Sequence, residues 1–170
     1  SVLDVGCGNG ALKKVLPSHR LYGVDVLADS VNMAKKSGYI QAKRIDLNRQ
    51  KLPFRKHMFD AVICRQVLEH LLFPLTTTKE IYRVLKPTGF FVLSLAGKQD
   101  GFYGALLKPR SNTITDPYTK ISSVLFTKEE IKKGFSGFKI IDYLRTSDES
   151  EMHGKVYMRD TLNFIIEKQK

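Results

Sequence analysis

Strand-like segments alternate with helix-like segments through residues 1–96, and no other feature of the chain restricts its fold as strongly. The apolar patterns predict strands at residues 2–5, 21–25, 39–47, 60–64 and 89–96. They predict helices at residues 11–17, 28–38 and 76–86, the second of them capped by Asp29 or Ser30. Strands that alternate with helices need crossover connections, which give a parallel sheet covered on both faces. The sequence therefore predicts an α/β fold with a doubly wound sheet.

The alternation stops after Gly97. Residues 98–126 mix glycines, prolines and polar residues without periodicity, which is typical of a functional or mobile connection. The segment leaves the carboxyl end of the fifth strand, so we predict a substrate-side insertion that forms a wall or lid; the alternative is a passive crossover over the sheet. Beyond it, a capping box at Thr127 and Glu130 begins a helix, and strands follow at residues 138–144 and 162–168. We expect residues 1–170 to form a single domain.

The composition narrows the class of protein. The longest apolar stretch, FFVLSLAG, is far too short to span a membrane, so we expect no membrane span. Two cysteines in 170 residues make a poor disulfide framework, which favours a reducing compartment and hence a cytoplasmic location. The four histidines and two cysteines lack the spacing of metal ligands, so we expect no metal site.

The positive charge is concentrated in one stretch of the chain. The net charge is +11, and eight lysines and arginines lie between Lys35 and Lys56 against a single acid, Asp46. Such a stretch fits nucleic acid or another polyanion, although a basic face that is simply solvated is the favoured interpretation. The charge therefore leaves a nucleic-acid partner open.

Three glycines follow the first strand in the stretch VLDVGCGNG. Ligands of open parallel sheets bind beyond the carboxyl ends of the strands, and glycines there let a ligand approach the backbone. Gly6, Gly8 and Ala11 match the loose dinucleotide pattern, while S-adenosylmethionine also fits such a turn. Asp4, directly before the turn, would repel a pyrophosphate and attract an ammonium group. It therefore favours S-adenosylmethionine over NAD.

Two further acids come at the ends of strands. Asp25 ends the second strand, where its carboxylate can accept hydrogen bonds from both hydroxyls of a ribose. Its competing role is to cap the next helix. Asp46 follows the third strand, where it can accept a bond from the amino group of an adenine, or serve only as a turn aspartate. Both acids favour an adenosine-containing ligand.

Several motifs in order resemble one family. The stretches VLDVGCGNG, GVD, IDLN, PFRKHMFDAVICRQVLEHL and EIYRVLKPTGFFVLS are similar to class I S-adenosylmethionine-dependent methyltransferases, most of all to the type 11 subgroup with quinone-biosynthesis enzymes. The resemblance implies a Rossmann-like, seven-stranded sheet, mostly parallel with an antiparallel last strand. It implies an enzyme with S-adenosylmethionine as cofactor and S-adenosylhomocysteine as product. Family members usually have helices before the first strand that help to cover the cofactor, so we expect the natural polypeptide to start earlier.

The same resemblance implies the site residues. Those near the cofactor would be Asp4, Gly6, Cys7, Gly8, Gly10, Asp25, Val26, Asp46, Leu47 and Arg65. Arg65 departs from the family, which often has a small or polar residue after the fourth strand. A cation is unfavourable beside a sulfonium, so we expect Arg65 to turn toward the cofactor carboxylate or toward an acid of the protein.

A general base is needed only where the methyl acceptor still holds its proton. His70, in the stretch VLEHL just past the cofactor edge, is the candidate catalytic residue; otherwise it orders the loop. The acceptor we expect is a small molecule or a lipid- or sugar-linked group. The alternatives are an RNA acceptor and a non-catalytic binding protein on the same fold. The sequence leaves the oligomeric state open.

Overall fold

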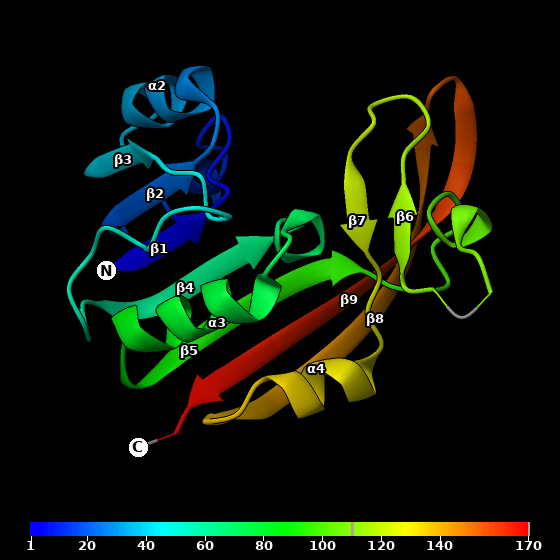
Figure 1. Cartoon of the computed structure of the whole chain (residues 1–170). Coiled ribbons are helices and arrows are strands. Elements are labelled where there is room, and N and C mark those ends of the chain that lie inside the picture. Colours follow the sequence, from blue (N-terminus) through cyan, green and yellow to red (C-terminus); the bar gives the residue numbers. More distant parts are fainter. Residues whose placement is uncertain (110, 170) are drawn as a thin grey trace.

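A seven-stranded sheet forms the centre of the protein, in the order β3-β2-β1-β4-β5-β9-β8 (Figure 1). The structure, a computed structural model, describes residues 1–109 and 111–169. The strands of the sheet are β1 (Val2–Val5), β2 (Leu21–Asp25), β3 (Gln41–Arg44), β4 (Phe59–Arg65), β5 (Leu85–Ala96), β8 (Phe138–Met152) and β9 (Lys155–Lys168). A separate two-stranded sheet pairs β6 (Thr113–Thr115) with β7 (Ser122–Val124).

The directions of the strands confirm the predicted fold class. Strands β1 to β5 pair in parallel, and β9 runs antiparallel to both β5 and β8. The reversal of strand order between β1 and β4 puts the carboxyl ends of β1, β2 and β4 at one edge, where an open α/β sheet binds its ligand. The sheet is therefore mostly parallel, with an antiparallel last strand.

Helices cover the sheet on both faces. They are α1 (Leu12–Val15), α2 (Ala28–Lys36), α3 (Pro74–Val84) and α4 (Lys128–Gly134), with short 3₁₀ turns η1 (Leu68–His70) and η2 (Gly104–Leu106). Because side chains alternate along a strand, Leu3 and Val62 pack in one core cluster with Ile81 of α3, whereas Val2 and Leu21 pack in the other cluster. Figure 1 shows α3 and α4 on the same side of the sheet.

The helix boundaries differ from those predicted, and the start of α2 and the end of α3 have clear physical reasons. Neither Asp29 nor Ser30 caps α2: its N-cap is Leu27, whose N–H donates to the Asp25 carboxylate at 2.9 Å. Helix α3 ends at Val84 rather than residue 86, and β5 begins at once. The buried ammonium of Lys168 donates to the carbonyl oxygens of Tyr82 and Leu85 at this junction, so a cation 83 residues beyond Leu85 binds the carbonyl groups at the end of the helix.

The hairpin formed by β8 and β9 is much longer than predicted. Residues 145–161, which the sequence analysis left outside strands, pair in continuous register from Arg145–Leu162 to Met152–Lys155. The connecting residues His153 and Gly154 both have positive φ, which matches the two-residue turns that suit right-twisted hairpins. Figure 1 shows the hairpin extending beyond the sheet beside β6 and β7.

Residues 98–126 fold against that hairpin. The Asp100 carboxylate accepts hydrogen bonds from Arg159 Nε at 2.6 Å and from the N–H groups of Phe102 and Tyr103. The ring of His153 stacks on the ring of Tyr118 with centroids 4.0 Å apart. The segment is thus held to the hairpin by long-range contacts, in addition to its own short elements η2, β6 and β7.

No helix among residues 1–109 and 111–169 is both long enough and apolar enough to span a membrane.

Candidate functional site

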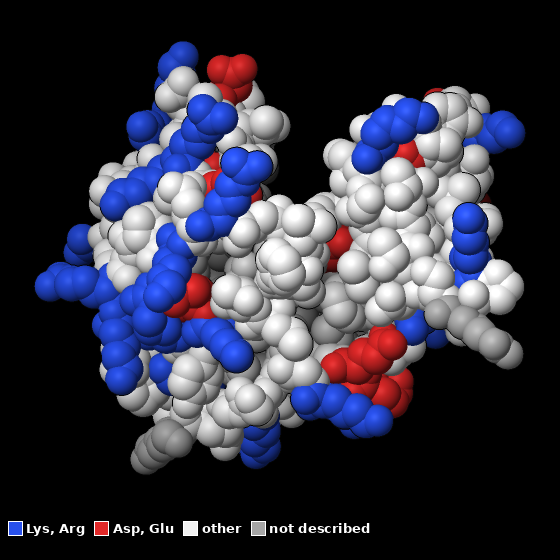
Figure 2. Space-filling view, viewed as in Figure 1, with Lys and Arg blue, Asp and Glu red and all other residues white. Residues whose placement is uncertain are grey.

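A cavity of about 290 Å³ opens at the carboxyl ends of β1, β2 and β3. Its lining residues come from four strand ends, from η1 and from the start of β7: Gly6, Val24, Asp25, Val26, Ile45, Asp46, Leu47, Asn48, Gln66, Val67, His70, Leu71 and Ile121. Figure 2 shows the surface hollowed between the lobe that carries α2 and β3 and the β6–β7 hairpin. Six of the residues singled out from the sequence therefore meet at one cavity: Gly6, Asp25, Val26, Asp46, Leu47 and His70.

The glycine turn forms one wall of the cavity. Gly6 has φ +76°, and a Cβ built on it would overlap the Cγ2 atom of Val67. Only glycine therefore fits at this position beside Val67. Gly8 also has positive φ, but a Cβ there would meet nothing within 4 Å. The Gly6 and Cys7 N–H groups both donate to the carbonyl oxygen of Val24, which ties the turn to β2.

Asp25 holds the turn from the end of β2. Its Oδ2 atom accepts the N–H of Gly8 at 2.9 Å, and its Oδ1 atom accepts the N–H of Leu27 at 2.9 Å. Each carboxylate oxygen has more than one lone pair, so both can accept a further hydrogen bond from a ligand. The two roles considered for Asp25 are therefore compatible: it orders the entry to α2 and still faces the cavity.

The opposite wall follows β3. The Asp46 Oδ1 atom accepts the N–H of Asn48 at 3.0 Å, and the Asp46 Oδ2 atom lies 3.4 Å from Arg49 Nε. The Asn48 side chain accepts the N–H of Leu72 at 2.8 Å, which joins this wall to the segment after η1. Asp46 is therefore a turn aspartate that also lines the cavity with Leu47.

His70 lies on the third side of the cavity. Its Nδ1 atom is 2.9 Å from the hydroxyl oxygen of Ser123 on β7, so the ring bridges η1 and the 98–126 segment. Burial lowers the pKa of His70 below its ordinary value, and the ring is neutral at pH 7. A neutral imidazole held at Nδ1 has its second nitrogen available for proton transfer.

Glu69, next to His70, faces the interior. It is 1% exposed, and its Oε1 atom accepts the N–H of Ala96 at 3.3 Å, while Oε2 has no hydrogen-bond partner among the described residues. Burial raises the pKa of Glu69 to about 7. In the turn η1, Glu69 therefore bonds to β5, and the next residue, His70, lines the cavity.

The remaining predicted residues, Asp4, Cys7, Gly8, Gly10 and Arg65, lie outside the cavity lining. Asp4 is buried and accepts the hydroxyl of Tyr39 at 2.5 Å, and burial raises the pKa of Asp4 to about 6. A Cβ on Gly10 would overlap Ser37, so this glycine lets the turn approach α2. Arg65 is exposed at the end of β4, and its charge lowers the pKa of Asp4 without an ion pair.

The arrangement matches a known family. A sequence profile described as a methyltransferase domain, of type 11, matches residues 3–93, which is more than half of the chain. The chain belongs to this family. It is a class I S-adenosylmethionine-dependent methyltransferase domain of the type 11 group.

Curated relatives of the methyltransferase match over about half of the chain. Demethylmenaquinone methyltransferase of Lactococcus lactis subsp. lactis is 36% identical over 98 residues, which cover 52% of this chain and 39% of that protein. Ubiquinone biosynthesis O-methyltransferase of Haemophilus ducreyi is 31% identical over 103 residues, which cover 55% of this chain and 44% of that protein. The chain thus spans less than half the length of these relatives.

A solved structure shows the same fold over nearly the whole methyltransferase chain. A SAM-dependent methyltransferase from Methanosarcina mazei superposes with a TM-score of 0.75 at 19% sequence identity. The superposition covers 99% of this chain and 92% of that one. It therefore includes the β8–β9 hairpin and the 98–126 segment, which lie outside the matched profile.

The family and the fold imply S-adenosylmethionine as the cofactor of this methyltransferase. The cavity fits that group. Its aliphatic walls, Val24, Ile45 and Leu71 among them, suit a flat adenine ring, and the Asp25 carboxylate at its rim suits the hydroxyls of a ribose. At Gly6 the backbone approaches the lining residue Val67 so closely that no Cβ fits between them.

Some lining residues of the methyltransferase escaped the sequence analysis. Gln66 has φ +55°, donates its N–H to Ser94 at 2.7 Å and lines the cavity one position beyond Arg65, because β4 runs one residue further than predicted. The end of β4 was the right place to expect a lining residue, but the predicted strand ended one residue too early. Ile121 joins the lining through the fold of residues 98–126, for which the local sequence gives no signal.

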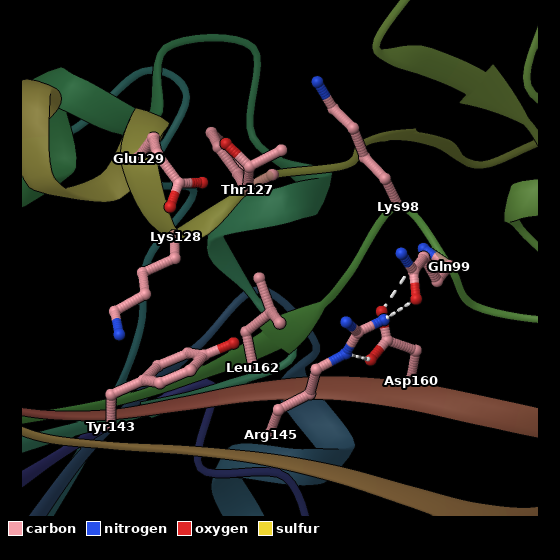
Figure 3. Close-up of a pocket in the computed structure, with 10 residues that line it drawn as sticks. Lys98, Gln99, Thr127, Lys128, Glu129, Tyr143, Arg145, Asp160 and Leu162 are labelled. Carbon is pink, nitrogen blue, oxygen red and sulfur yellow. Dashed lines mark hydrogen bonds and ion pairs between the residues drawn. The ribbon is translucent and has the colours of Figure 1, made fainter.

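A second cavity, of about 270 Å³, lies between α4 and the β8–β9 hairpin (Figure 3). Its cations are matched within the chain: Arg145 Nε is 2.6 Å from Asp160, and Lys98 Nζ is 2.9 Å from Glu130. The Lys128 ammonium lies 4.1 Å from the centre of the Tyr143 ring. Figure 3 shows the Asp160 carboxylate between Arg145 and Gln99. The charged groups that could bind a ligand here are thus already paired with groups of the protein, so we place the methyltransferase site in the first cavity.

Among the described residues of the methyltransferase, no three histidine, cysteine, aspartate or glutamate side chains gather as a metal site.

Proposed function

We propose that this protein transfers a methyl group from S-adenosylmethionine to a small-molecule acceptor with an apolar body. The observation that carries the proposal is the single cavity lined by the Asp25 carboxylate, by aliphatic side chains and by His70. The names of the two curated relatives, both quinone-pathway methyltransferases, support an acceptor of that kind. We also propose a cytoplasmic location, which two free and buried cysteines support.

The positions of the lining residues support a set of cofactor contacts. Asp25 would bind the ribose hydroxyls, and Asp46 and Leu47 would border the adenine, since all three line the cavity. The Gly6–Gly10 turn, of which Gly6 lines the cavity, would border the methionine end. The exposed guanidinium of Arg65 would reach the cofactor carboxylate. When bound, the cofactor supplies a methyl group that its positive sulfur activates for displacement. The protein then contributes mainly the alignment of the acceptor, which for well-placed reactants is worth roughly 7–11 kcal/mol.

His70 would take the proton of the acceptor. When Nδ1–H donates to the Ser123 hydroxyl, the lone pair of Nε2 is free to accept a proton from an acceptor hydroxyl. The lowered pKa of His70 favours the neutral ring that this transfer requires, and the Ser123 hydroxyl holds the orientation of the ring. We also propose that the 98–126 segment forms the wall of the acceptor site, since Ser123 and Ile121 belong to it.

Replacement of Asp25 by alanine tests the cofactor site. We expect the Asp25→Ala variant to bind S-adenosylhomocysteine at least about tenfold more weakly, because charge-assisted bonds to two hydroxyls are lost and each contributes roughly 1.5–3 kcal/mol. Isothermal titration calorimetry measures the affinity. The matched control is Asp29→Ala, which removes an exposed acid four residues away, outside the cavity lining. Unchanged affinity in a folded Asp25→Ala variant would contradict the assignment, and tighter binding of NAD than of S-adenosylhomocysteine would contradict the cofactor.

Replacement of His70 by alanine tests the proton transfer. With a hydroxylated quinol as acceptor, we expect turnover to fall by roughly 10²–10⁴, the usual contribution of a general base. The affinity for S-adenosylhomocysteine should change little. Ser123→Ala is the matched control for orientation and should cause a smaller loss of turnover, since the base itself remains. The release of S-adenosylhomocysteine measures turnover. An equal loss of cofactor affinity and turnover in the His70→Ala variant would show that the ring only orders the loop.

A further inference from the structure

Exposed aliphatic and aromatic side chains gather at the mouth of the cavity. We call Val26, Leu27, Leu72, Phe73 and Ile121 the mouth patch; each is between 50% and 73% exposed. Val26 and Ile121 line the cavity itself, and Leu27 directly follows Val26. The N–H of Leu72 donates to the side chain of Asn48, which is also a lining residue, and Phe73 follows Leu72. The patch therefore borders the cavity where the chain leaves β2 and η1 and where it approaches β7.

Among the described residues, each of these side chains keeps half or more of its surface exposed. Leu72 and Phe73 precede the first turn of α3, a helix that buries Ile81 and Val84 at its other end. Single exposed apolar residues are ordinary on a protein surface, but a contiguous group usually marks a place of interaction. Figure 2 shows a mostly uncharged area in the middle of the view, over η1 and the start of α3. The mouth patch is thus a candidate contact surface.

Cations border the patch on the side of β3. The Arg44 Nε atom donates to the carbonyl oxygen of Val26 at 3.0 Å, which fixes this guanidinium beside the mouth. Arg49 lies beside the lining residue Asp46, and Lys51 borders a neighbouring recess that shares Leu47 and Asn48 with the cavity. Figure 2 shows Lys and Arg side chains over the lobe of α2 and β3, next to the uncharged area. An apolar centre and a basic border therefore share one face.

We infer that the mouth patch docks on an anionic lipid surface. The apolar side chains would enter the boundary between head groups and acyl chains, and Arg44, Arg49 and Lys51 would face the lipid phosphates. Either contribution alone gives weak and reversible binding, whereas apolar insertion combined with basic residues gives stable attachment. Docking in this orientation would open the cavity directly onto the bilayer. The docking stands on the surface itself; only the further step, that an apolar acceptor enters from the bilayer, rests on the proposed function.

The side chains at the centre of the patch favour lipid over nucleic acid. Four of the five, Val26, Leu27, Leu72 and Ile121, are aliphatic, so they have neither hydrogen-bonding groups for base edges nor rings on which bases stack. Binding of RNA through the neighbouring cations would depend on phosphates and salt, and it would be insensitive to the loss of aliphatic side chains. Binding of lipid requires both parts of the surface.

Co-sedimentation with vesicles tests the inference. The protein is mixed with vesicles of phosphatidylcholine alone and of phosphatidylcholine and phosphatidylglycerol in equal parts. We expect binding to the anionic vesicles, with little binding to the neutral ones. The Leu72→Ser/Phe73→Ser variant should bind the anionic vesicles at least about tenfold more weakly, because each large apolar side chain contributes about a tenfold change or more when it leaves water. The Arg49→Gln/Lys51→Gln variant should lose affinity mainly at low salt.

The matched control is Val156→Ser/Met158→Ser, which removes two apolar side chains of similar exposure on β9, away from the cavity. It should bind vesicles as the unchanged protein does. Both serine variants should bind S-adenosylhomocysteine normally, so a failure of cofactor binding would count against the proposed function and not against docking.

Three results would overturn the inference. The first is no preference for anionic vesicles, and the second is an equal loss in the control variant. The third is a different occupant. It would be the helices expected before the first strand, if a longer polypeptide that includes them does not bind the vesicles. It would be single-stranded RNA, if its binding depends on Leu72 and Phe73, or a second copy of the chain, if size-exclusion chromatography shows a dimer that these two substitutions convert to a monomer.

Discussion

Gly6→Ala is expected to lower the free energy of unfolding by about 2–4 kcal/mol and to weaken S-adenosylhomocysteine binding by at least about 30-fold. The new methyl group would overlap the Cγ2 atom of Val67, and the residue would keep a φ of +76° that favours glycine. The turn can relieve this overlap only by moving Val67 or itself, and both line the cavity. Chemical denaturation and calorimetry measure the two effects.

Gly8→Ala is the matched control for Gly6→Ala. Gly8 also has positive φ, but its added methyl group would meet no atom of the protein within 4 Å. We therefore expect only the cost of a left-handed alanine, about 1–2 kcal/mol of unfolding free energy. If the two variants lose the same stability, backbone conformation matters and the overlap with Val67 does not.

Asp100→Ala is expected to lower the free energy of unfolding by about 3–5 kcal/mol, the usual cost of removing one partner from a buried ion pair. The Asp100 carboxylate is fully buried and accepts Arg159 Nε at 2.6 Å. It also accepts the N–H groups of Phe102, Tyr103 and Asp160. Its loss would leave a partly buried guanidinium and three N–H groups without their acceptor. Denaturation in urea measures the change.

The control for Asp100→Ala is Glu149→Ala, which removes an exposed acid from the same hairpin and should change stability by less than about 0.5 kcal/mol. Hydrogen exchange adds a local measurement: protection should fall first in residues 98–126, which Asp100 ties to the hairpin. A loss of stability below about 1 kcal/mol for Asp100→Ala would show that packing of Phe102 holds this segment instead of the ion pair.

The part of the fold that periodicity describes was predicted well. Strand β2 has the predicted bounds Leu21–Asp25, and the capping box of Thr127 and Glu130 forms as expected. The outer half of the β8–β9 hairpin was not predicted, since its sequence has no apolar alternation. Residues 145–161 are held instead by strand pairing and by polar pairs such as Arg145–Asp160. Pairings of that kind join residues far apart in the chain, so no short window of sequence contains them.

The candidate site was predictable where it depends on strand ends. Asp25 and Asp46 follow strands whose carboxyl ends meet at one edge, so their position at the cavity followed from topology. Asp4 also stands at a strand end, but its carboxylate is bonded to Tyr39, 35 residues away. The approach of Ser123 to His70 likewise depends on how residues 98–126 fold, which local pattern does not reveal.

The position of β9 between β5 and β8 has a consequence for how the sheet is completed during synthesis. The ribosome makes β9 after every other strand of the sheet, yet β8 pairs with β9 alone. Until β9 emerges, β8 has no strand to join, and the far edge of β5 stays open although Phe91 and Leu93 belong to the core. Contacts of such long sequence separation form slowly, and an open apolar edge invites pairing with other chains. The parallel part of the sheet therefore stays incomplete until β9 is made. In the time between the synthesis of β5 and that of β9, the nascent chain is most exposed to aggregation.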